Sequence, residues 1–338
     1  MTKVAVLGAS GYAGAELLRL LGGHPEFEVT YATGDSAVGT LVADSFPSLA
    51  GAYPGLVYEA VDVEEAAAHD LVFLALPHGA SSDVVPQLVD KVAGIVDLGA
   101  DFRLRDASLY PQWYGETHRA PELLARFVHG IPELYRDEIV AGKLVAAAGC
   151  YPTAAALSLA PLVSHGLIER TGVIVDAASG VSGAGKVPKA NTHFNTVDED
   201  FSAYGLLTHR HTPEMEQATC AQILFTPHLA PMNRGILATC YARPTGALSS
   251  DDLLAALHDA YAEEPFVVVS ERSPSTKATL GSNAAHITAR VDERTGWAIV
   301  ICAIDNLGKG AAGQMVQCAN LIVGLPETTG LTTMGVYP

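Results

Sequence analysis

Three glycines near the N-terminus constrain the fold of this chain more than any other feature. Gly8, Gly11 and Gly14 are three residues apart and lie between an apolar run at 3–8 and a helical pattern at 13–22. Glycines in such a strand-to-helix turn leave the backbone N–H groups of a helix N-terminus open to a pyrophosphate. A tight turn without a ligand is the alternative, but we favour a dinucleotide site, whose residues are Gly8, Ser10, Gly11, Tyr12, Ala13 and Gly14.

Strand and helix patterns alternate through the first half of the chain. Short apolar runs separated by helical patterns occur at 27–32, 70–76, 94–98 and 143–148, which is typical of a parallel sheet covered on both faces. After residue 150 the runs become β-branched and alternating, and the last two are joined by a hairpin turn at 293–296. We therefore expect an α/β fold with a Rossmann-type doubly wound parallel sheet plus an α+β domain that has a mostly antiparallel sheet.

The charge and the cysteines narrow the class of protein. The chain has 20 Lys and Arg against 37 Asp and Glu, and its formal charge of −17 argues against binding nucleic acid or an anionic membrane by bulk charge. Five cysteines, far apart and never in a C-x-x-C pair, indicate reduced thiols and neither a disulfide framework nor a zinc site. With no leader pattern and no apolar run of about 18–20 residues, we expect a cytoplasmic protein without a membrane span or a metal.

The residues after the second apolar run bear on which dinucleotide is bound. An aspartate in the place of Asp35 can hold a ribose 2′-hydroxyl and so favours NAD, whereas a 2′-phosphate is usually bound by Arg or Lys. No arginine is near, although Ser36 and backbone amides could bind a phosphate. Taken alone, these residues lean weakly towards NAD.

Cys150 is the strongest candidate for a nucleophile. It follows an apolar strand pattern at 144–149, and Pro152 suits the first turn of the helix that comes next. At a helix N-terminus the free N–H groups and the macrodipole stabilise a thiolate, which lowers the pKa of the thiol. A buried, inert cysteine at a strand end is the alternative, and packing is the interpretation we favour for Cys220, Cys240, Cys302 and Cys318.

A nucleophilic cysteine needs a base or an imidazolium partner, and the sequence HRHTPE at 209–214 supplies candidates. Two imidazoles, a guanidinium and a carboxylate fall within six residues, just ahead of a helical pattern. His209 and His211 could instead form a metal pair, but no further ligand cluster has suitable spacing. A hydrophilic loop before a helix is the other alternative. Weaker candidates for the partner are His78, His129 and His193.

Two further loops have the composition of binding loops. The small residues of SGVSGAGK at 179–186 would let a flat ring or an anion approach the backbone, although the spacing of a Walker loop is absent. Asn306 could orient an amide by hydrogen bonding on both sides, and Lys309 could meet a phosphate. Ordinary turn chemistry explains Asn306 and Lys309 equally well.

Eight sequence blocks follow one another over nearly the whole chain. They are GASGYAG at 8–14, FLALPHGAS at 73–81, DFRL at 101–104, HGIPEL at 129–134, GCYPT at 149–153, SGVSGAGK at 179–186, HRHTPE at 209–214 and DNLGKGAAGQ at 305–314. Together they closely resemble the N-acetyl-γ-glutamyl-phosphate reductase family, which is related in fold and chemistry to aspartate-semialdehyde dehydrogenase and the glyceraldehyde-3-phosphate dehydrogenases.

The resemblance implies an NADPH-dependent enzyme of arginine biosynthesis that reduces an acyl phosphate to an aldehyde through a cysteine thioester. It makes Cys150 the nucleophile and places the acid/base histidine at His209 first and His211 second. We expect NADP(H) despite Asp35, because the match over the whole chain outweighs one loop residue. The further residues expected at the cofactor are Ser36, Ser179, Gly180 and Asn306, and those expected at the substrate are Arg103, Ser182, Gly183, Lys186, Arg210 and Glu214.

The resemblance also implies how the chain is divided. The dinucleotide-binding domain is expected at 1–149 and 309–338, and the catalytic and oligomerisation domain at 150–308, in a homotetramer or a dimer. A related reductase whose substrate hangs on a small acidic carrier protein is one alternative, but a chain of charge −17 would repel that partner. A non-catalytic NAD(P)-binding sensor is another, but it should lack the nucleophile or its histidine, and both are present.

Overall fold

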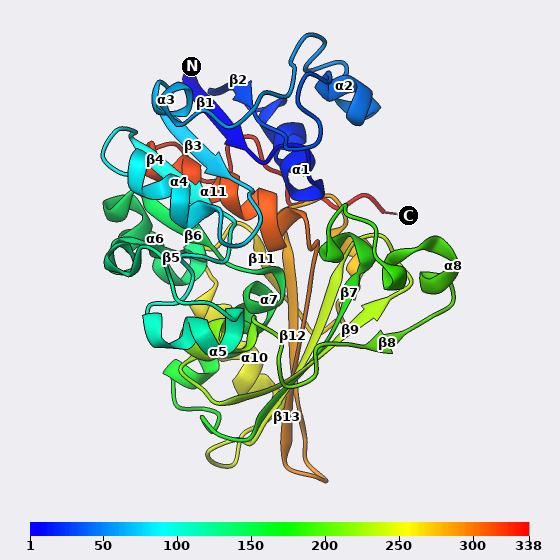
Figure 1. The fold of residues 1–338 in the computed structure, drawn as a ribbon. Helices are drawn as coiled ribbons and strands as arrows, with labels where there is room; N and C mark the ends of the chain where they lie inside the picture. Colours follow the sequence, from blue (N-terminus) through cyan, green and yellow to red (C-terminus); the bar gives the residue numbers. More distant parts are fainter. Residues whose placement is uncertain (338) are drawn as a thin grey trace. The chain divides into compact units, whose positions relative to one another are not determined.

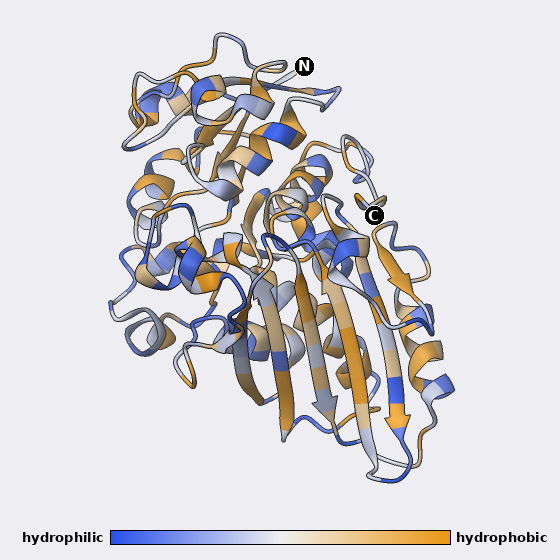
Figure 2. Ribbon diagram, turned by 90° about the vertical axis from the view of Figure 1, so that its right-hand side faces the viewer, coloured by the Kyte–Doolittle hydropathy of each residue, from blue (hydrophilic) through white to orange (hydrophobic). Residues whose placement is uncertain are grey.

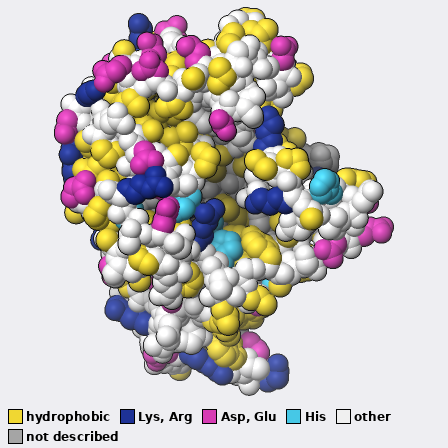
Figure 3. Space-filling view, in the orientation of Figure 1, with side chains coloured by type: hydrophobic (Ala, Val, Ile, Leu, Met, Phe, Trp, Pro, Cys, Tyr) yellow, Lys and Arg dark blue, Asp and Glu magenta, His cyan; other side chains and the backbone are white. Residues whose placement is uncertain are grey.

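A computed structural model describes residues 1–337 of the chain, which divide into two compact units (Figure 1). The first unit contains residues 1–148 and 311–331, and the second contains residues 149–310 together with the residues from Thr332 onward. On the face drawn in Figure 3, acidic and basic side chains are interspersed with apolar ones. None of the five cysteines forms a disulfide.

The first unit is built on a six-stranded parallel sheet in the order β2-β1-β3-β4-β6-β5. The strands are β1 (Thr2–Leu7), β2 (Phe27–Ala32), β3 (Leu71–Leu74), β4 (Gly94–Asp97), β5 (Val128–Gly130) and β6 (Leu144–Ala147). From β1 the strand order runs outward to β2 on one side and to β3 on the other. Open α/β sheets bind their ligands at the carboxyl ends of the strands beside such a switch point.

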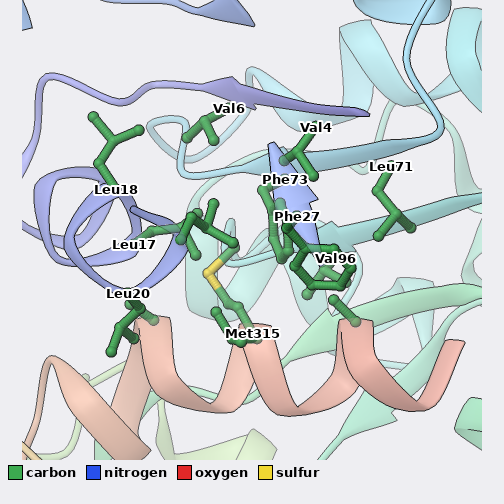
Figure 4. Close-up of a cluster of buried hydrophobic side chains, with 14 of the residues drawn as sticks. Val4, Val6, Leu17, Leu18, Leu20, Phe27, Leu71, Phe73, Val96 and Met315 are labelled. Carbon is green, nitrogen blue, oxygen red and sulfur yellow. The ribbon is translucent and has the colours of Figure 1, made fainter. Parts of the chain in front are cut away.

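Apolar layers cover both faces of this sheet. Alternate residues of β1 point to opposite faces: Val4 and Val6 belong to one apolar cluster, Ala5 and Leu7 to another. Figure 4 shows the first cluster, in which Met315 lies with residues of the sheet and of α1. Burial on both faces explains why the strands read as continuous apolar runs. The helices of this unit are α1 (Tyr12–Leu21), α2 (Val42–Ser45), α3 (Val63–Ala67), α4 (Ser81–Leu88), α5 (Tyr110–Tyr114), α6 (Pro132–Gly142) and α11 (Gly313–Ile322).

The second unit is built on a seven-stranded mixed sheet in the order β11-β12-β13-β10-β7-β9-β8. Its strands are β7 (Val173–Gly180), β8 (Ser202–Ala203), β9 (Ile223–Ala230), β10 (Ile236–Ala242), β11 (Val267–Val269), β12 (Ala285–Asp292) and β13 (Trp297–Ile304). Four of its six strand pairs are antiparallel, including the expected hairpin, where Asp292 of β12 faces Trp297 of β13. The predicted fold class is therefore confirmed.

Helices cover one face of the second sheet. α7 (Cys150–Ser164) contacts β10 and β13, and α10 (Ser250–Ala260) contacts β12; the other helices are α8 (Phe194–Val197) and α9 (Thr212–Thr219). The strands alternate in polarity and burial (Figure 2). We call the side opposite the helices the open face. A row of directly paired residues crosses it, formed by Leu224, Ile174, Tyr241 and Ile299, and all four are at least partly exposed.

Two expectations differ from the structure. Residues 309–338 were expected with the first unit, but Lys309, Gly310 and the residues from Thr332 onward belong to the second. Backbone hydrogen bonds hold the C-terminal residues there, because Val336 N–H donates to the carbonyl of Leu280 at 2.7 Å. Cys220 was expected to be a packing residue, but α9 ends at Thr219 and Cys220 is exposed with a left-handed φ of 54°. The packing interpretation is confirmed for the buried residues Cys240, Cys302 and Cys318.

Candidate active site

The three glycines of the first turn have three different reasons to be glycine. Gly8 has φ +85°, and a Cβ there would lie 2.4 Å from the carbonyl oxygen of Ala75 at the end of β3. A Cβ on Gly14 would lie 2.6 Å from the Gly8 oxygen, so α1 packs directly on the turn. Gly11 is the N-cap of α1, has no side-chain cap, and a Cβ there would meet nothing closer than 3.9 Å. The turn therefore leaves no room for a side chain at Gly8 or Gly14, whereas the backbone at Gly11, where the helix begins, is open. This arrangement suits a pyrophosphate.

The end of β2 supports this turn. The Thr33 hydroxyl accepts the Gly8 N–H at 3.0 Å, and its carbonyl accepts the Ala9 N–H at 2.7 Å. Asp35 and Ser36 follow and are exposed. They lie at the carboxyl end of the strand next to β1, where dinucleotide-binding units hold the ribose.

Two buried aspartates organise the loop that follows β3. The Asp101 carboxylate accepts the N–H groups of Gly79 (2.8 Å) and Ser82 (2.9 Å) and lies 2.5 Å from His78 Nδ1. Asp97 accepts the Ser81 hydroxyl at 2.9 Å, and burial raises the pKa of Asp97 to about 7. Neither aspartate was predicted as a site residue; the available signals were a carboxylate at the end of the apolar strand β4 for Asp97 and the DFRL block for Asp101.

Arg103 and His129, both in the first unit, are buried. Arg103 donates to the carbonyl of Leu98 at 2.6 Å. Burial, together with the charges of Arg103 and Arg105, lowers the pKa of His129 to about 3. His129 is therefore neutral at pH 7.

In the second unit, Cys150 is the first residue of α7 and is partly exposed, as expected from the sequence. Its N-cap, Gly149, donates its N–H to the Glu214 carboxylate at 2.8 Å, and Glu214 is fully buried. A Cβ on Gly310 would lie 2.8 Å from the Cys150 Cβ, so the chain of the DNLGKG block passes directly beside Cys150. Neither the anchoring contact of Glu214 nor the closeness of Gly310 was predicted.

His209 lies in an aromatic cluster beside the start of α7. Its ring centroid is 5.6 Å from that of Tyr151, 5.6 Å from that of Tyr204 and 5.3 Å from that of Phe225, all edge to face. His209 Nδ1 accepts the backbone N–H of His211 at 3.1 Å, so a neutral ring carries its proton on Nε2. Burial, and to a lesser extent the charge of Arg210, lowers the pKa of His209 to about 4.

His211 shares this cluster. Its ring centroid is 4.8 Å from that of His209 and 5.9 Å from that of Tyr151, and it is the N-cap of α9. Arg210, between the two histidines, is exposed. The structure thus brings both histidines against Tyr151, the neighbour of Cys150. Tyr204 and Phe225 were not predicted, because no motif marks them.

The loop at 179–186 is tied to a second loop by Asn306. The Asn306 side chain accepts the Gly235 N–H at 2.7 Å and donates to the Ser182 hydroxyl at 3.0 Å. Gly180 packs against the same second loop, because a Cβ there would lie 2.6 Å from the Asn233 oxygen. The two ends of the Asn306 amide therefore link the loop at 179–186 to the loop that contains Gly235. Ser179 and Ser182 are buried, whereas Gly183 and Lys186 are exposed.

Within residues 1–337, no group of three or more His, Cys, Asp or Glu side chains is placed to hold a metal ion. The same residues contain no helix with the length and apolar character needed to cross a membrane.

Comparison with known proteins identifies similar families. The model of the semialdehyde dehydrogenase NAD binding domain matches residues 3–141, and that of the semialdehyde dehydrogenase dimerisation domain matches residues 150–306. A protein of Citrifermentans bemidjiense named N-acetyl-gamma-glutamyl-phosphate reductase is 48% identical over 347 residues, covering 100% of each chain. One of the same name from Symbiobacterium thermophilum is 47% identical over 99% of each chain.

Solved structures share the fold. Aspartate semialdehyde dehydrogenase from Candida albicans, solved with NADP, has a TM-score of 0.74 at 16% identity and covers 96% of this chain and 99% of its own. Aspartate semialdehyde dehydrogenase II from Vibrio cholerae has a TM-score of 0.70 at 16% identity and covers 96% of this chain and 98% of its own. At that identity the likeness concerns the fold alone.

Proposed function

Because this chain belongs to the N-acetyl-γ-glutamyl-phosphate reductase family, we propose that it reduces N-acetyl-L-glutamyl 5-phosphate to N-acetyl-L-glutamate 5-semialdehyde and phosphate. The reaction is a step of arginine biosynthesis and takes place in the cytoplasm, where the chain's thiols stay reduced. One observation carries the proposal: Cys150 begins α7, and its neighbour Tyr151 contacts both histidines of the HRHTPE block.

The first step makes a thioester on Cys150. The thiolate attacks the acyl carbon, a C–S bond forms, and the C–O bond to phosphate breaks with its electron pair leaving on phosphate. The N–H groups at the start of α7 favour the thiolate form of Cys150. Glu214 holds Gly149 and so fixes the backbone from which the nucleophile projects.

The second step reduces this thioester. When bound, NADPH supplies a hydride to the thioester carbonyl carbon. His209 has its proton on Nε2 and a pKa of about 4, which favours hydrogen-bond donation to the developing oxyanion over proton uptake. Collapse of this oxyanion breaks the C–S bond, releases the aldehyde and returns the Cys150 thiolate. We assign to His211 the removal of the thiol proton that precedes the first step.

NADP(H) is the cofactor we propose for the first unit. The turn from Gly8 to Gly14 fits a pyrophosphate, because a Cβ would fill the cradle at Gly8 and Gly14 but not at Gly11. Ser36, exposed at the end of β2, is assigned to the 2′-phosphate. Asp35, the residue before Ser36, argues against this assignment, because an aspartate there favours a ribose 2′-hydroxyl.

The substrate residues are assigned by their match to the family blocks. Lys186 and Arg210 of the second unit supply positive charge for the phosphate, and the loop with Ser182 and Gly183 supplies hydroxyl and backbone donors. Arg103, in the first unit, is assigned to the substrate by its place in the DFRL block. Ser179, Gly180 and Asn306 are assigned to the nicotinamide side, with Asn306 acting through the loops that it joins. Glu214 acts through its contact with Gly149.

We propose a homotetramer or a dimer that uses the open face of the second sheet. The matching domain is described as a dimerisation domain, and Leu224 on the open face is 51% exposed. A Leu224→Asp variant should shift the native oligomer to smaller species in analytical ultracentrifugation. Val61→Asp, at a residue 47% exposed in the first unit, is the matched control and should leave the mass unchanged.

The function is tested at 340 nm in the reverse direction, with N-acetyl-glutamate semialdehyde, NADP⁺ or NAD⁺, and phosphate present or absent. Phosphate-dependent reduction of NADP⁺ supports substrate, cofactor and thioester phosphorolysis together. Activity with NAD⁺ alone would mean that Asp35 governs the ribose site. No activity with either would contradict the free substrate and point to a carrier-linked one.

A further inference from the structure

Two tyrosine hydroxyls are joined beside the nucleophile. Tyr204 donates to the hydroxyl of Tyr151 at 3.1 Å, and Tyr151 donates to the backbone carbonyl of His228 at 3.1 Å. The three residues come from the loop after β8, the first turn of α7 and β9. Burial raises the pKa of Tyr204 to about 12 and also raises that of Tyr151, so both hydroxyls keep their protons at neutral pH. Both hydroxyl donors of this chain of hydrogen bonds are therefore present at neutral pH.

The rings of the same two tyrosines enclose His209. Tyr151 and Tyr204 each lie 5.6 Å from the His209 ring, at interplanar angles of 87° and 67°. Together with Phe225 they place three aromatic rings around the imidazole. The titratable or charged groups around His209 are thus Tyr151, Tyr204, His211 and Arg210, and burial is the main reason why its pKa is low.

The backbone that carries Tyr204 turns back sharply towards His209. Gly205 and Leu207 have left-handed φ angles of +57° and +62°, and a Cβ on Gly205 would lie 3.4 Å from the His209 ring. The side chain of Leu207 is 74% exposed, so it adds little anchoring. Tyr204 is attached by its backbone N–H, which donates to Pro227 at 3.1 Å, and by its hydroxyl. Tyr204 is thus the point at which this turn is fastened to the start of α7.

We propose that Tyr204 is a positioning residue for His209: its hydroxyl fastens the turn at 204–209 to Tyr151, and its ring encloses one side of the imidazole. Tyr204 acts through His209 and takes no part in bond making. The expected effect of Tyr204 on turnover rests on the proposed function of His209. The expected effect of Tyr204 on the pKa of His209 does not depend on that function.

Two substitutions separate the hydroxyl from the ring. Tyr204→Phe removes one hydrogen bond and keeps the ring, so kcat should fall about 3- to 10-fold with KM unchanged. Tyr204→Ala also opens the enclosure to water, so the pKa of His209 should rise from about 4 towards 6.5. That titration is followed by NMR of histidine-labelled full-length protein, with the His209 signal assigned from a His209→Gln variant.

The control is Tyr53→Phe, which removes a buried tyrosine hydroxyl that donates to the carbonyl of Leu18 at 2.9 Å in the first unit. It should leave both kcat and the His209 titration unchanged. If Tyr204→Phe retains full kcat and Tyr204→Ala leaves the His209 titration unchanged, the proposal is wrong. If the wild-type protein lacks reductase activity, the proposed function fails, but the titration still decides whether Tyr204 encloses His209.

Discussion

The carboxylate of Glu214 accepts the backbone N–H of Gly149 at 2.8 Å, one residue before Cys150. This bond joins α9, which follows the two histidines, to the first turn of α7. Because Glu214 is fully buried, water cannot replace it as the acceptor. The backbone beside Cys150 is therefore held by a residue that lies 64 positions away from Cys150 in the sequence.

Glu214→Ala should destabilise the protein by about 1–3 kcal/mol, because the Gly149 N–H is left buried without this acceptor. Glu214→Gln keeps an acceptor oxygen and should cost less. Denaturant unfolding followed by circular dichroism measures both. Equal stabilities for the two variants would show that the hydrogen bond to Gly149 contributes nothing.

Only Cys150 and Cys220 are accessible enough to react with iodoacetamide, because the other three cysteines are buried. In a Cys220→Ser background we expect one thiol to be alkylated, with loss of all turnover in parallel. Because it lies at the start of α7, this thiol should react at pH values well below about 8.5, the ordinary pKa of a cysteine thiol. Mass spectrometry locates the label, and turnover that survives complete alkylation of Cys150 would exclude the thioester mechanism.

The glycines of the first turn should respond differently to alanine. Gly14→Ala places a Cβ 2.6 Å from backbone atoms and should destabilise the protein by about 1–3 kcal/mol. Gly11→Ala meets no protein atom closer than 3.9 Å, so it should leave stability nearly unchanged but weaken NADP(H) binding, measured by calorimetry. Gly51→Ala, in open space in the same unit, is the control for both. Full NADP(H) affinity in Gly11→Ala would place the pyrophosphate elsewhere.

Asp97 should make stability depend on pH. Burial raises its pKa from 3.8 to about 7 in the folded state, so between these values the folded protein holds a proton that the unfolded chain has lost. Its contribution to the free energy of unfolding therefore falls as pH rises from about 4 to 7, by at most about 1.4 kcal/mol per unit, and is constant above that. Asp97→Asn should remove this dependence. Parallel stability curves for the two proteins would contradict a protonated Asp97.

The parts of the site that are local in sequence could be predicted. The turn from Gly8 to Gly14 and the place of Cys150 at a helix start follow from a few neighbouring residues, because strand ends, glycine spacing and a helix start are local signals. Both were found in the structure where the sequence placed them. The same holds for the HRHTPE block, whose two histidines precede α9.

The surroundings of these residues could not be predicted. Tyr204 lies in a loop and Phe225 in a strand, neither of them within a motif, and only the folded chain brings their rings against His209. Gly310 reaches Cys150 from the far end of the chain. Cys220 was misjudged because helical periodicity does not show where a helix ends, and α9 stops one residue earlier. Long-range packing decided the first two cases, and the position of a helix end decided the third.

The place of α11 in the sequence bears on how the first unit is made in the cell. Its buried residues, such as Met315, complete an apolar layer whose other buried members, apart from Ala312, come from residues 4 to 147. A ribosome must therefore synthesise all of residues 149–310 before this layer can close. Until then the nascent chain exposes the apolar side chains on one face of the sheet to water. We therefore expect chaperones to bind it during translation. Loss of the last 30 residues should harm the first unit most, although it begins the chain.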